Sequence, residues 1–233
     1  MKLARPNVFH PRILLVSGRQ LGDGGDSGLV EALRRRGLSA RWMPWDDPQT
    51  ENADLVILAA VSDPADRRKD FLSWTTRVRN LLNPPAVLAW NSDKHYLVDL
   101  ADAGIPVTTR GATGHRTVLI FLGGQQSHAF RRTTAGRLIP AEPDFELWDL
   151  GRSALDAACA KAGMSTSELL YARVDLTGSA EGPSVRQLDL IEPDLGWQYL
   201  DSETRALQQR RFALGVESAC ERLGLGPLSH RGP

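Results

Sequence analysis

Two stretches in the C-terminal half place acidic side chains within the alternating pattern of β-strands: YARVDL, residues 171–176, and RQLDLIEP, residues 186–193. Aspartate is depleted within strands, so a carboxylate in each stretch calls for a chemical or structural reason. The segment between the two stretches contains glycine and proline, which predicts a loop joining two strands of a hairpin.

Pairing these strands so that apolar side chains meet places Val174 opposite Leu188. The side chains that then share the other face are Arg173, Asp175, Gln187 and Asp189. Carboxylates on one strand face can hold Mg²⁺, and arginines there can hold a phosphate or carboxylate group. The simpler alternative, which the pattern by itself favours, is a ladder of Arg–Asp ion pairs on a solvated sheet face.

The composition limits the classes of protein to consider. The chain has 233 residues, 42% of them hydrophobic, and its 28 basic residues balance its 28 acidic ones. A chain without a basic excess is not expected to bind nucleic acid. The longest apolar run, residues 55–61, is too short to span a membrane, and residues 1–11 lack the apolar core of a signal peptide. We therefore expect a soluble cytoplasmic protein.

The elements that carry these residues differ between the two halves of the chain. Residues 1–107 alternate apolar strand patterns with helical spacing, which predicts a Rossmann-like lobe with a parallel sheet. Strands are expected over residues 12–18, 38–45, 53–61 and 86–90, and helices over residues 29–36, 68–82 and 92–103.

Residues 108–233 predict a lobe of α+β type with an antiparallel sheet. Gly123 and Gly124 separate two strand patterns, which is a strong signal for a hairpin turn. YARVDL and SVRQLDLI form the second hairpin, and helices are expected over residues 153–163 and 202–224. The fold class is therefore α/β, with one lobe of each kind.

Several segments, in order, resemble the ATP-grasp superfamily, and more closely its proteins with a glutathione-synthetase-like ATP-binding domain. They are LLNPPAVLAWNSDKHYLVDLADAGIPV (residues 81–107), TVLIFLGGQQSHAFRR (117–132), YARVDL (171–176) and LDLIEPDL (188–195). The resemblance implies a pre-ATP-grasp lobe followed by a C-terminal ATP-grasp lobe. Such proteins use ATP, usually with two Mg²⁺ ions, to phosphorylate a carboxylate that an amine then attacks.

The resemblance also assigns roles to single residues. Lys94 matches the first lysine that binds the nucleotide, and Asp175 matches a carboxylate that binds Mg²⁺. Asp189 and Gln187 fall where the family places metal-holding glutamates. The other matched positions, two that face a phosphate or anionic intermediate and one on the first hairpin, are Arg116, Arg131 and His128.

The departures from the family pattern concern its catalytic groups. Only residues 107–116 separate Pro106 from the body of the next strand, which is too short for the subdomain that covers the nucleotide in the family. The family's second lysine has no counterpart, because Lys161 is the only lysine after Lys94. Gln187 replaces a carboxylate, and an amide binds Mg²⁺ more weakly. The sequence therefore predicts a truncated ATP-grasp protein with weakened metal chemistry.

The favoured hypothesis is a repurposed fold, without ATP-dependent ligation and without a cofactor. It would bind or convert a small organic molecule in the cleft between the lobes, and the resemblance places it in specialised biosynthesis. Lys94 would act as a cation or a nucleophile. The candidates for acid–base chemistry are His128, Asp175, Asp189 and Glu192, and those for holding an anionic group are Arg131 and Arg173.

Two alternatives stay open at this point. In a minimal ATP- and Mg-dependent carboxylate–amine ligase, Lys94 and Arg116 would bind the nucleotide, and Asp175 and Asp189 would bind Mg²⁺. In a non-catalytic pseudoenzyme, the surface left by the missing subdomain would dock a biosynthetic partner protein or a second copy of the chain.

Overall fold

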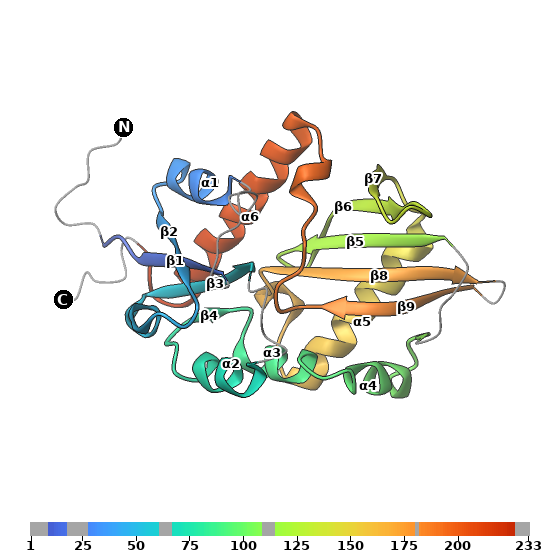
Figure 1. The fold of residues 1–233 in the computed structure, drawn as a ribbon, viewed down its shortest axis with the longest axis horizontal. Coiled ribbons are helices and arrows are strands. Elements are labelled where there is room, and N and C mark those ends of the chain that lie inside the picture. The colour runs from blue at the N-terminus through green and yellow to red at the C-terminus, as the bar shows by residue number, and fades with distance from the viewer. Residues whose placement is uncertain (1–8, 18–27, 61–66, 109–114, 180–181, 227–233) are drawn as a thin grey trace. The chain divides into compact units, whose positions relative to one another are not determined.

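The computed structural model describes residues 9–17, 28–60, 67–108, 115–179 and 182–226. The chain divides into two compact units, Met1–Pro85 with Gln209–Pro233, and Ala86–Gln208. Each unit has a sheet of its own, parallel with four strands in the first and antiparallel with five strands in the second (Figure 1). The fold is therefore the mixed α/β fold that the sequence predicts.

The parallel sheet of the first unit has the strand order β2-β1-β3-β4. Its central strands are continuous apolar runs, as expected for a sheet buried on both faces, and Leu15 and Ile57 have no exposed surface. The strands are β1 (Arg12–Ser17), β2 (Ser39–Pro44), β3 (Leu55–Ala60) and β4 (Leu81–Leu82).

The helical segments of the first unit pack on this sheet through aromatic and aliphatic side chains. Trp45, Phe71 and Trp74 form a buried cluster with ring centroids 5.6–5.7 Å apart. The segments are α1 (Leu29–Arg35), η1 (Pro48–Asn52) and α2 (Arg68–Thr75), together with the C-terminal part of α6 (Ser202–Arg222). Helix α2 ends earlier than predicted, since Leu81 and Leu82 form β4.

The antiparallel sheet of the second unit has the strand order β7-β6-β5-β8-β9. Gly123 and Gly124 have positive φ angles of 60° and 72°, which confirms the predicted tight turn of the first hairpin. The strands are β5 (Arg116–Leu122), β6 (Gln125–Arg132), β7 (Leu138–Ala141), β8 (Tyr171–Ser179) and β9 (Gly182–Asp189).

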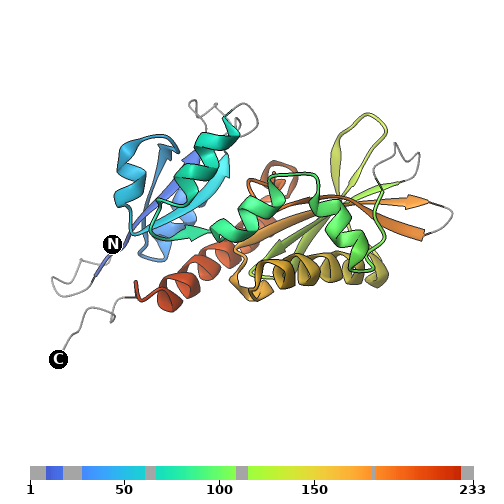
Figure 2. The ribbon, with the colours of Figure 1, turned by 90° about the horizontal axis from the view of Figure 1, so that it is seen from below.

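One face of this sheet is covered by helices. Helix α5 runs along it (Figure 2), and α3 and α4 contribute to the same buried core. The helices are α3 (Pro85–Asn91), α4 (Tyr96–Asp102) and α5 (Phe145–Ala162), and two short helical turns are η2 (Thr166–Glu168) and η3 (Trp197–Tyr199). Within the described residues, no helix combines the length and the apolar character needed to cross a membrane.

The segment AVLAW, predicted as a strand over residues 86–90, is instead part of helix α3. Pro85 occupies the first helical position, where its fixed φ and missing N–H are tolerated. A run of five apolar residues fits a buried strand and a buried helical turn equally well. Val87 and Leu88 are fully buried, so tertiary packing decides the outcome.

The boundary between the units differs from the one expected near Val107. Tyr96, Leu97 and Leu100 of α4 share a buried core with β8 and β9, so residues 86–107 belong to the second unit. Val107 itself forms a parallel bridge with Val185 of β9. Residues 209–233 fall in the first unit. The division follows the packing of the side chains and not the order of the chain.

The outer edge of β9 is hydrogen-bonded to side chains. Asn91, at the end of α3, donates from Nδ2 to the carbonyl of Leu188 (3.0 Å) and accepts at Oδ1 from the N–H of Leu190 (2.8 Å). The hydroxyl of Tyr96 accepts from the N–H of Leu188 (3.2 Å). These side chains satisfy backbone groups that would otherwise be buried without partners.

Candidate functional site

The β8–β9 hairpin forms in the predicted register. Val174 lies opposite Leu188, and both are buried in the core. Arg173 lies opposite Asp189, and Asp175 lies opposite Gln187. Because side chains alternate along each strand, these four polar residues share the face of the hairpin opposite to Val174 and Leu188.

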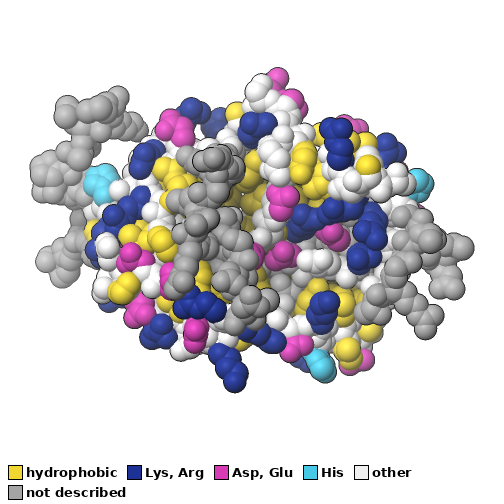
Figure 3. Space-filling view, viewed as in Figure 1, with side chains coloured by type: hydrophobic (Ala, Val, Ile, Leu, Met, Phe, Trp, Pro, Cys, Tyr) yellow, Lys and Arg dark blue, Asp and Glu magenta, His cyan; other side chains and the backbone are white. Residues whose placement is uncertain are grey.

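Strands β5 and β6 extend this polar face. Arg116 pairs with Thr177 of β8 on one side and with Arg132 of β6 on the other. Figure 3 shows basic side chains gathered over β5 and β8, with acidic side chains beside them. We call this surface the arginine face; its residues are Arg116, Arg132, Arg173, Asp175, Gln187 and Asp189.

Asp175 is held by arginine. Nε of Arg173 donates to its Oδ1 (2.6 Å), Nη2 of Arg173 donates to its Oδ2 (3.1 Å), and Nη2 of Arg132 lies 3.9 Å from Oδ2. Burial lowers the pKa of Arg173, but the hydrogen bonds and charge of Asp175 outweigh burial and raise the pKa overall. Two parallel hydrogen bonds fix the carboxylate and occupy both of its oxygens.

Asp189 closes the end of β9. Its Oδ1 accepts hydrogen bonds from the backbone N–H groups of Ile191 (3.1 Å) and Glu192 (3.3 Å). Burial raises the pKa of Asp189, although these two hydrogen bonds and the charge of Arg173 act in the opposite direction. The carboxylate at this strand end therefore has a structural task, which is to hold the turn that follows.

Arg131 does not reach the arginine face. It pairs with Thr117 in β5, its side chain is exposed, and alternation along β6 turns it to the opposite side of the sheet. The next residue, Arg132, takes the position expected for it. The register therefore separates Arg131 from Arg173, and the arginine of β6 that shares a face with Arg173 is Arg132.

His128 is enclosed within the second unit. It is 8% exposed, and its Nε2 lies 2.7 Å from the carbonyl oxygen of Leu195. Its Nδ1 lies 2.8 Å from the hydroxyl of Ser127. The rings of Phe130 and Trp197 pack against the imidazole at 5.4 Å and 5.6 Å between centroids. A histidine with both ring nitrogens engaged and its faces covered is suited to holding structure together.

Lys94 and Glu192 lie at turns. Lys94 is exposed in the turn before α4, where its backbone carbonyl accepts from the N–H of Leu97 (3.1 Å), and its ammonium group makes no hydrogen bond or ion pair with the described residues. Glu192 follows β9 directly, and its backbone N–H is bound by Asp189. Lys94 is therefore not joined to the arginine face by any contact between described residues, and Glu192 lies at the rim of that face.

Arg132 and Thr177 belong to the site but were not predicted from the sequence. Thr177 is 2% exposed, and its Oγ1 has no hydrogen-bond partner among the residues that the structure describes. It lies beside Arg116, whose guanidinium likewise makes no hydrogen bond or ion pair within the described part of the chain. The guanidinium of Arg116 thus keeps donors that no described residue uses, whereas the hydroxyl of Thr177 is buried.

Oxygen ligands suited to Mg²⁺ are scarce on the arginine face. Among the described residues, no three His, Cys, Asp or Glu side chains are placed to share an ion. Asp175 is bound by Arg173, and Asp189 is bound by backbone N–H groups. Mg²⁺ requires a nearly octahedral shell of oxygens, and a neighbouring guanidinium repels it. This set of side chains fits an anionic group better than a magnesium ion.

Known structures share this architecture. The structure titled "Crystal structure of D-cycloserine synthetase DcsG" superposes with a TM-score of 0.73, covering 91% of this chain and 99% of that one at 22% identity. The ATP-grasp ligase PsnB, in a complex with Mg and ADP, superposes with a TM-score of 0.60 at 15% identity, covering 90% of this chain and 100% of that one. The chain has the ATP-grasp fold.

A third ATP-grasp relative is the D-alanine–D-alanine ligase from Bacillus anthracis, with a TM-score of 0.63 at 11% identity, covering 91% of this chain and 98% of that one. A family model described as the N-terminal domain of D-cycloserine synthetase DcsG matches residues 13–83. The cycloserine biosynthesis protein DcsG of Streptomyces lavendulae is 33% identical over 84 residues. That match covers 34% of this chain and 28% of the relative's length.

Proposed function

We propose that this ATP-grasp-fold protein serves the biosynthesis of a small molecule and binds or converts an anionic organic compound on the arginine face, without ATP-dependent ligation. The observation that carries the proposal is the pairing of Asp175 with Arg173. Both oxygens of Asp175, which the resemblance matches to a metal-binding carboxylate, accept hydrogen bonds from Arg173, at 2.6 Å and 3.1 Å. The positive guanidinium beside this carboxylate repels a Mg²⁺ ion, which disfavours metal binding there.

The arginines give the face its preference for anions. Arg173 is neutralised by Asp175, whereas Arg116 keeps its donors and Arg132 holds one backbone carbonyl, that of Gly136 (3.2 Å). A planar guanidinium matches a carboxylate or phosphate group with two parallel hydrogen bonds. We assign the binding of the anionic group to Arg116 and Arg132.

Asp189 is the acid–base group that the geometry supports best. It lies at the end of β9 opposite Arg173, and burial raises its pKa above the ordinary value of an aspartate. Its Oδ1 is bound to the turn that follows β9, so Oδ2 is the oxygen assigned to exchange a proton with a substrate. His128 is assigned to structure, because its ring is enclosed.

The short connection between α4 and β5 supports the loss of ligation. Residues 103–115 link the two elements, and a segment of this length is too short for a subdomain over a nucleotide. An acyl phosphate formed at an open site would be exposed to water. We infer that the protein is a truncated member of the fold, and that its substrate chemistry does not pass through such an intermediate.

Calorimetric titration with ATP and with ADP, each with and without Mg²⁺, tests the proposal. We expect no Mg-dependent binding at millimolar nucleotide, and the same result for the Asp175→Asn variant. Micromolar binding that requires Mg²⁺ and disappears in Asp175→Asn would contradict the proposal. A circular dichroism spectrum of Asp175→Asn that matches the spectrum of the wild type shows that the variant keeps its fold.

The second candidate is an ATP- and Mg-dependent carboxylate–amine ligase, and the shared fold favours it. PsnB binds Mg and ADP, and the D-alanine–D-alanine ligase binds ATP, in the structures that resemble this chain. In this case Lys94 and Arg116 would bind the nucleotide, and Mg-dependent release of ADP in the presence of an acid and an amine would be observed. Arg110 could replace the missing lysine in the same way as Arg116, but it lies outside the described residues.

A further inference from the structure

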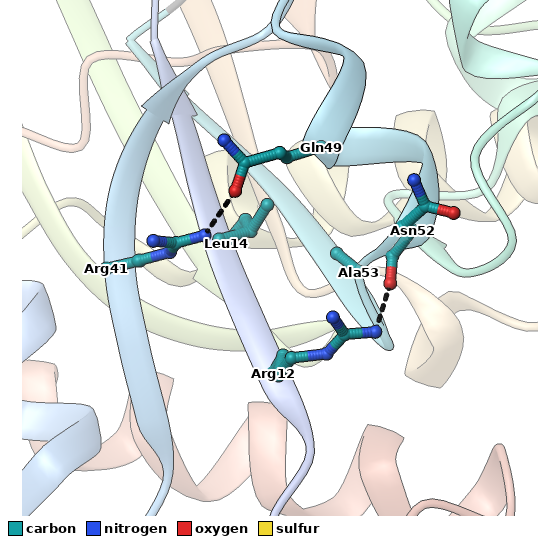
Figure 4. Close-up of a pocket in the computed structure, with 6 residues that line it drawn as sticks. All are labelled: Arg12, Leu14, Arg41, Gln49, Asn52 and Ala53. Carbon is teal, nitrogen blue, oxygen red and sulfur yellow. Dashed lines mark hydrogen bonds between the residues drawn. The ribbon is translucent and has the colours of Figure 1, made fainter.

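A pocket in the first unit lies toward the end of the parallel sheet at which β1 and β3 begin (Figure 4). It has a volume of about 440 Å³, which falls in the range of small-molecule sites. Its walls come from the beginning of β1, the middle of β2 and the segment from η1 to β3. The lining residues are Arg12, Leu14, Arg41, Gln49, Asn52 and Ala53.

The register of the parallel sheet brings the two arginines together. Leu14 lies opposite Arg41, and Arg12 lies opposite Ser39, so Arg12, Leu14 and Arg41 project from the same face. Arg12 and Arg41 are therefore diagonal neighbours on adjacent strands. Two like charges at such positions repel one another, although both side chains are exposed and water screens part of the repulsion. A negative group between them would turn this repulsion into attraction.

The charges of this pocket are not balanced. Arg12 donates to the carbonyl of Asn52, and its Nε lies 3.4 Å from Oδ2 of Asp54. Arg41 donates to Oε1 of Gln49 (3.2 Å), a neutral group, and makes no ion pair with any described residue. The two guanidinium groups thus face one carboxylate, and most of the N–H donors of Arg41 have no protein partner.

A second pocket of the first unit shows the contrast. It has about 380 Å³ and also holds two arginines, but each is paired with a carboxylate at 2.7 Å, Arg67 with Asp46 and Arg77 with Glu51. Arg67 also packs on the ring of Trp45, 4.7 Å from its centroid. Those arginines are used within the protein, whereas Arg41 is available to a ligand.

We propose that the Arg12–Arg41 pocket binds a small organic molecule through an oxyanion group, a carboxylate or a phosphate. The two guanidinium groups bind the oxyanion, and Leu14 and Ala53 contact the apolar part of the molecule. Open parallel sheets bind their substrates at the carboxyl ends of the strands. This pocket lies at the opposite end, so it is a second ligand site, separate from the arginine face.

A nuclear magnetic resonance titration of the full chain tests the site, with inorganic phosphate and succinate as probes and chloride at matched ionic strength as the reference. We expect saturable shifts of the Nε–H signals of Arg12 and Arg41 and of the amide of Gln49. The Arg41→Gln variant should weaken binding by at least about tenfold. Arg77→Gln, which removes a paired arginine of the other pocket, is the matched control and should leave binding unchanged.

The result that overturns the proposal is equally specific. The site is rejected if neither probe gives saturable shifts in the wild type, or if Arg41→Gln binds as the wild type does. Signals away from the pocket that superpose on those of the wild type show that the variant is folded. An Arg12→Gln variant repeats the test from the neighbouring strand, and unchanged binding there also contradicts the site.

Discussion

Asp175 and Asp189 carry the same chemical group on neighbouring strands, yet their surroundings give them different tasks. Asp175 faces Arg173, which neutralises it and fixes both of its oxygens. Asp189 accepts hydrogen bonds from backbone N–H groups, and its burial raises its pKa. Local partners, more than residue type, therefore decide what each carboxylate does in the fold.

Replacing Asp189 by asparagine should flatten the dependence of stability on pH. Burial raises the pKa of Asp189 in the folded state, so the wild type loses stability as pH rises through that pKa. Asn keeps an oxygen for the N–H groups of Ile191 and Glu192 but carries no charge. In urea unfolding across the acidic range, the free energy of unfolding of Asp189→Asn should lie within about 1 kcal/mol of that of the wild type. It should decrease less than that of the wild type as the pH rises towards neutral. A steeper decrease would contradict this account.

Replacing His128 by alanine should destabilise the fold. The change removes the hydrogen bond to Leu195 and leaves a cavity between Phe130 and Trp197, which should cost about 2–4 kcal/mol in the free energy of unfolding. The control is His95→Ala, because the side chain of His95 is 89% exposed. It should change stability by less than about 0.5 kcal/mol. Equal denaturation midpoints for the two variants would refute the structural role.

At the scale of elements, the turn between β5 and β6 offers a matched pair of glycines. Gly123 and Gly124 both have positive φ, so Ala at either position should cost about 1–2 kcal/mol. A Cβ at Gly124 would also lie 2.6 Å from the carbonyl oxygen of Thr166, whereas a Cβ at Gly123 meets nothing within 4 Å. Thermal unfolding should therefore place Gly124→Ala well below Gly123→Ala. The reverse order would show that the hairpin does not approach η2 as described.

The side chain of Asn91 should be essential to the edge of β9. Asn91→Ala removes both hydrogen bonds that the side chain makes with the backbone of Leu188 and Leu190, which should cost about 2–4 kcal/mol. Hydrogen exchange at the amide of Leu190 should accelerate. Asn91→Asp keeps the acceptor for Leu190 but sets a carboxylate against the Leu188 carbonyl, so acidification should restore part of its stability. If both variants match the wild type, these hydrogen bonds contribute nothing.

The strands and their register could be predicted from the sequence because apolar alternation is strong along β8 and β9. The choice between Arg131 and Arg132 could not be made in the same way. Their strand carries apolar residues on both faces, Ala129 on one and Phe130 on the other, so the pattern does not say which face is core. The segment that became α3 is too short for periodicity to separate a strand from a helix.

For the whole molecule, the fold and its chemistry are separate questions. Identities of 11–22% accompany TM-scores of 0.60–0.73 with ATP-grasp structures, so the architecture tolerates extensive replacement of side chains. Within this frame, we expect single positions, such as Gln187 opposite Asp175, to set the chemistry. The order of the segments could be predicted from the sequence, but the Arg173–Asp175 pairing depends on side-chain geometry.

Removing divalent ions should leave the stability of the whole protein unchanged. A bound ligand at about a hundred times its Kd adds about 2.7 kcal/mol of stability. Because the side chains of the arginine face do not fit Mg²⁺, neither EDTA nor added Mg²⁺ with ATP should move the midpoint of thermal unfolding. A higher midpoint with Mg²⁺ and ATP, absent in Asp175→Asn, would contradict this expectation.

The hydrogen bonds from Asn91 and Tyr96 have a consequence for how copies of the protein meet. An open edge strand is a template for adding a strand from another molecule, which leads to aggregation. In the second sheet, side chains already occupy backbone groups of β9. The opposite edge, β7, has four residues and contains Pro140, which lacks an N–H. Neither edge therefore offers a full row of unpaired backbone groups. In a crowded solution we expect this sheet not to add strands from other copies of the protein, and any self-association should use side-chain surfaces.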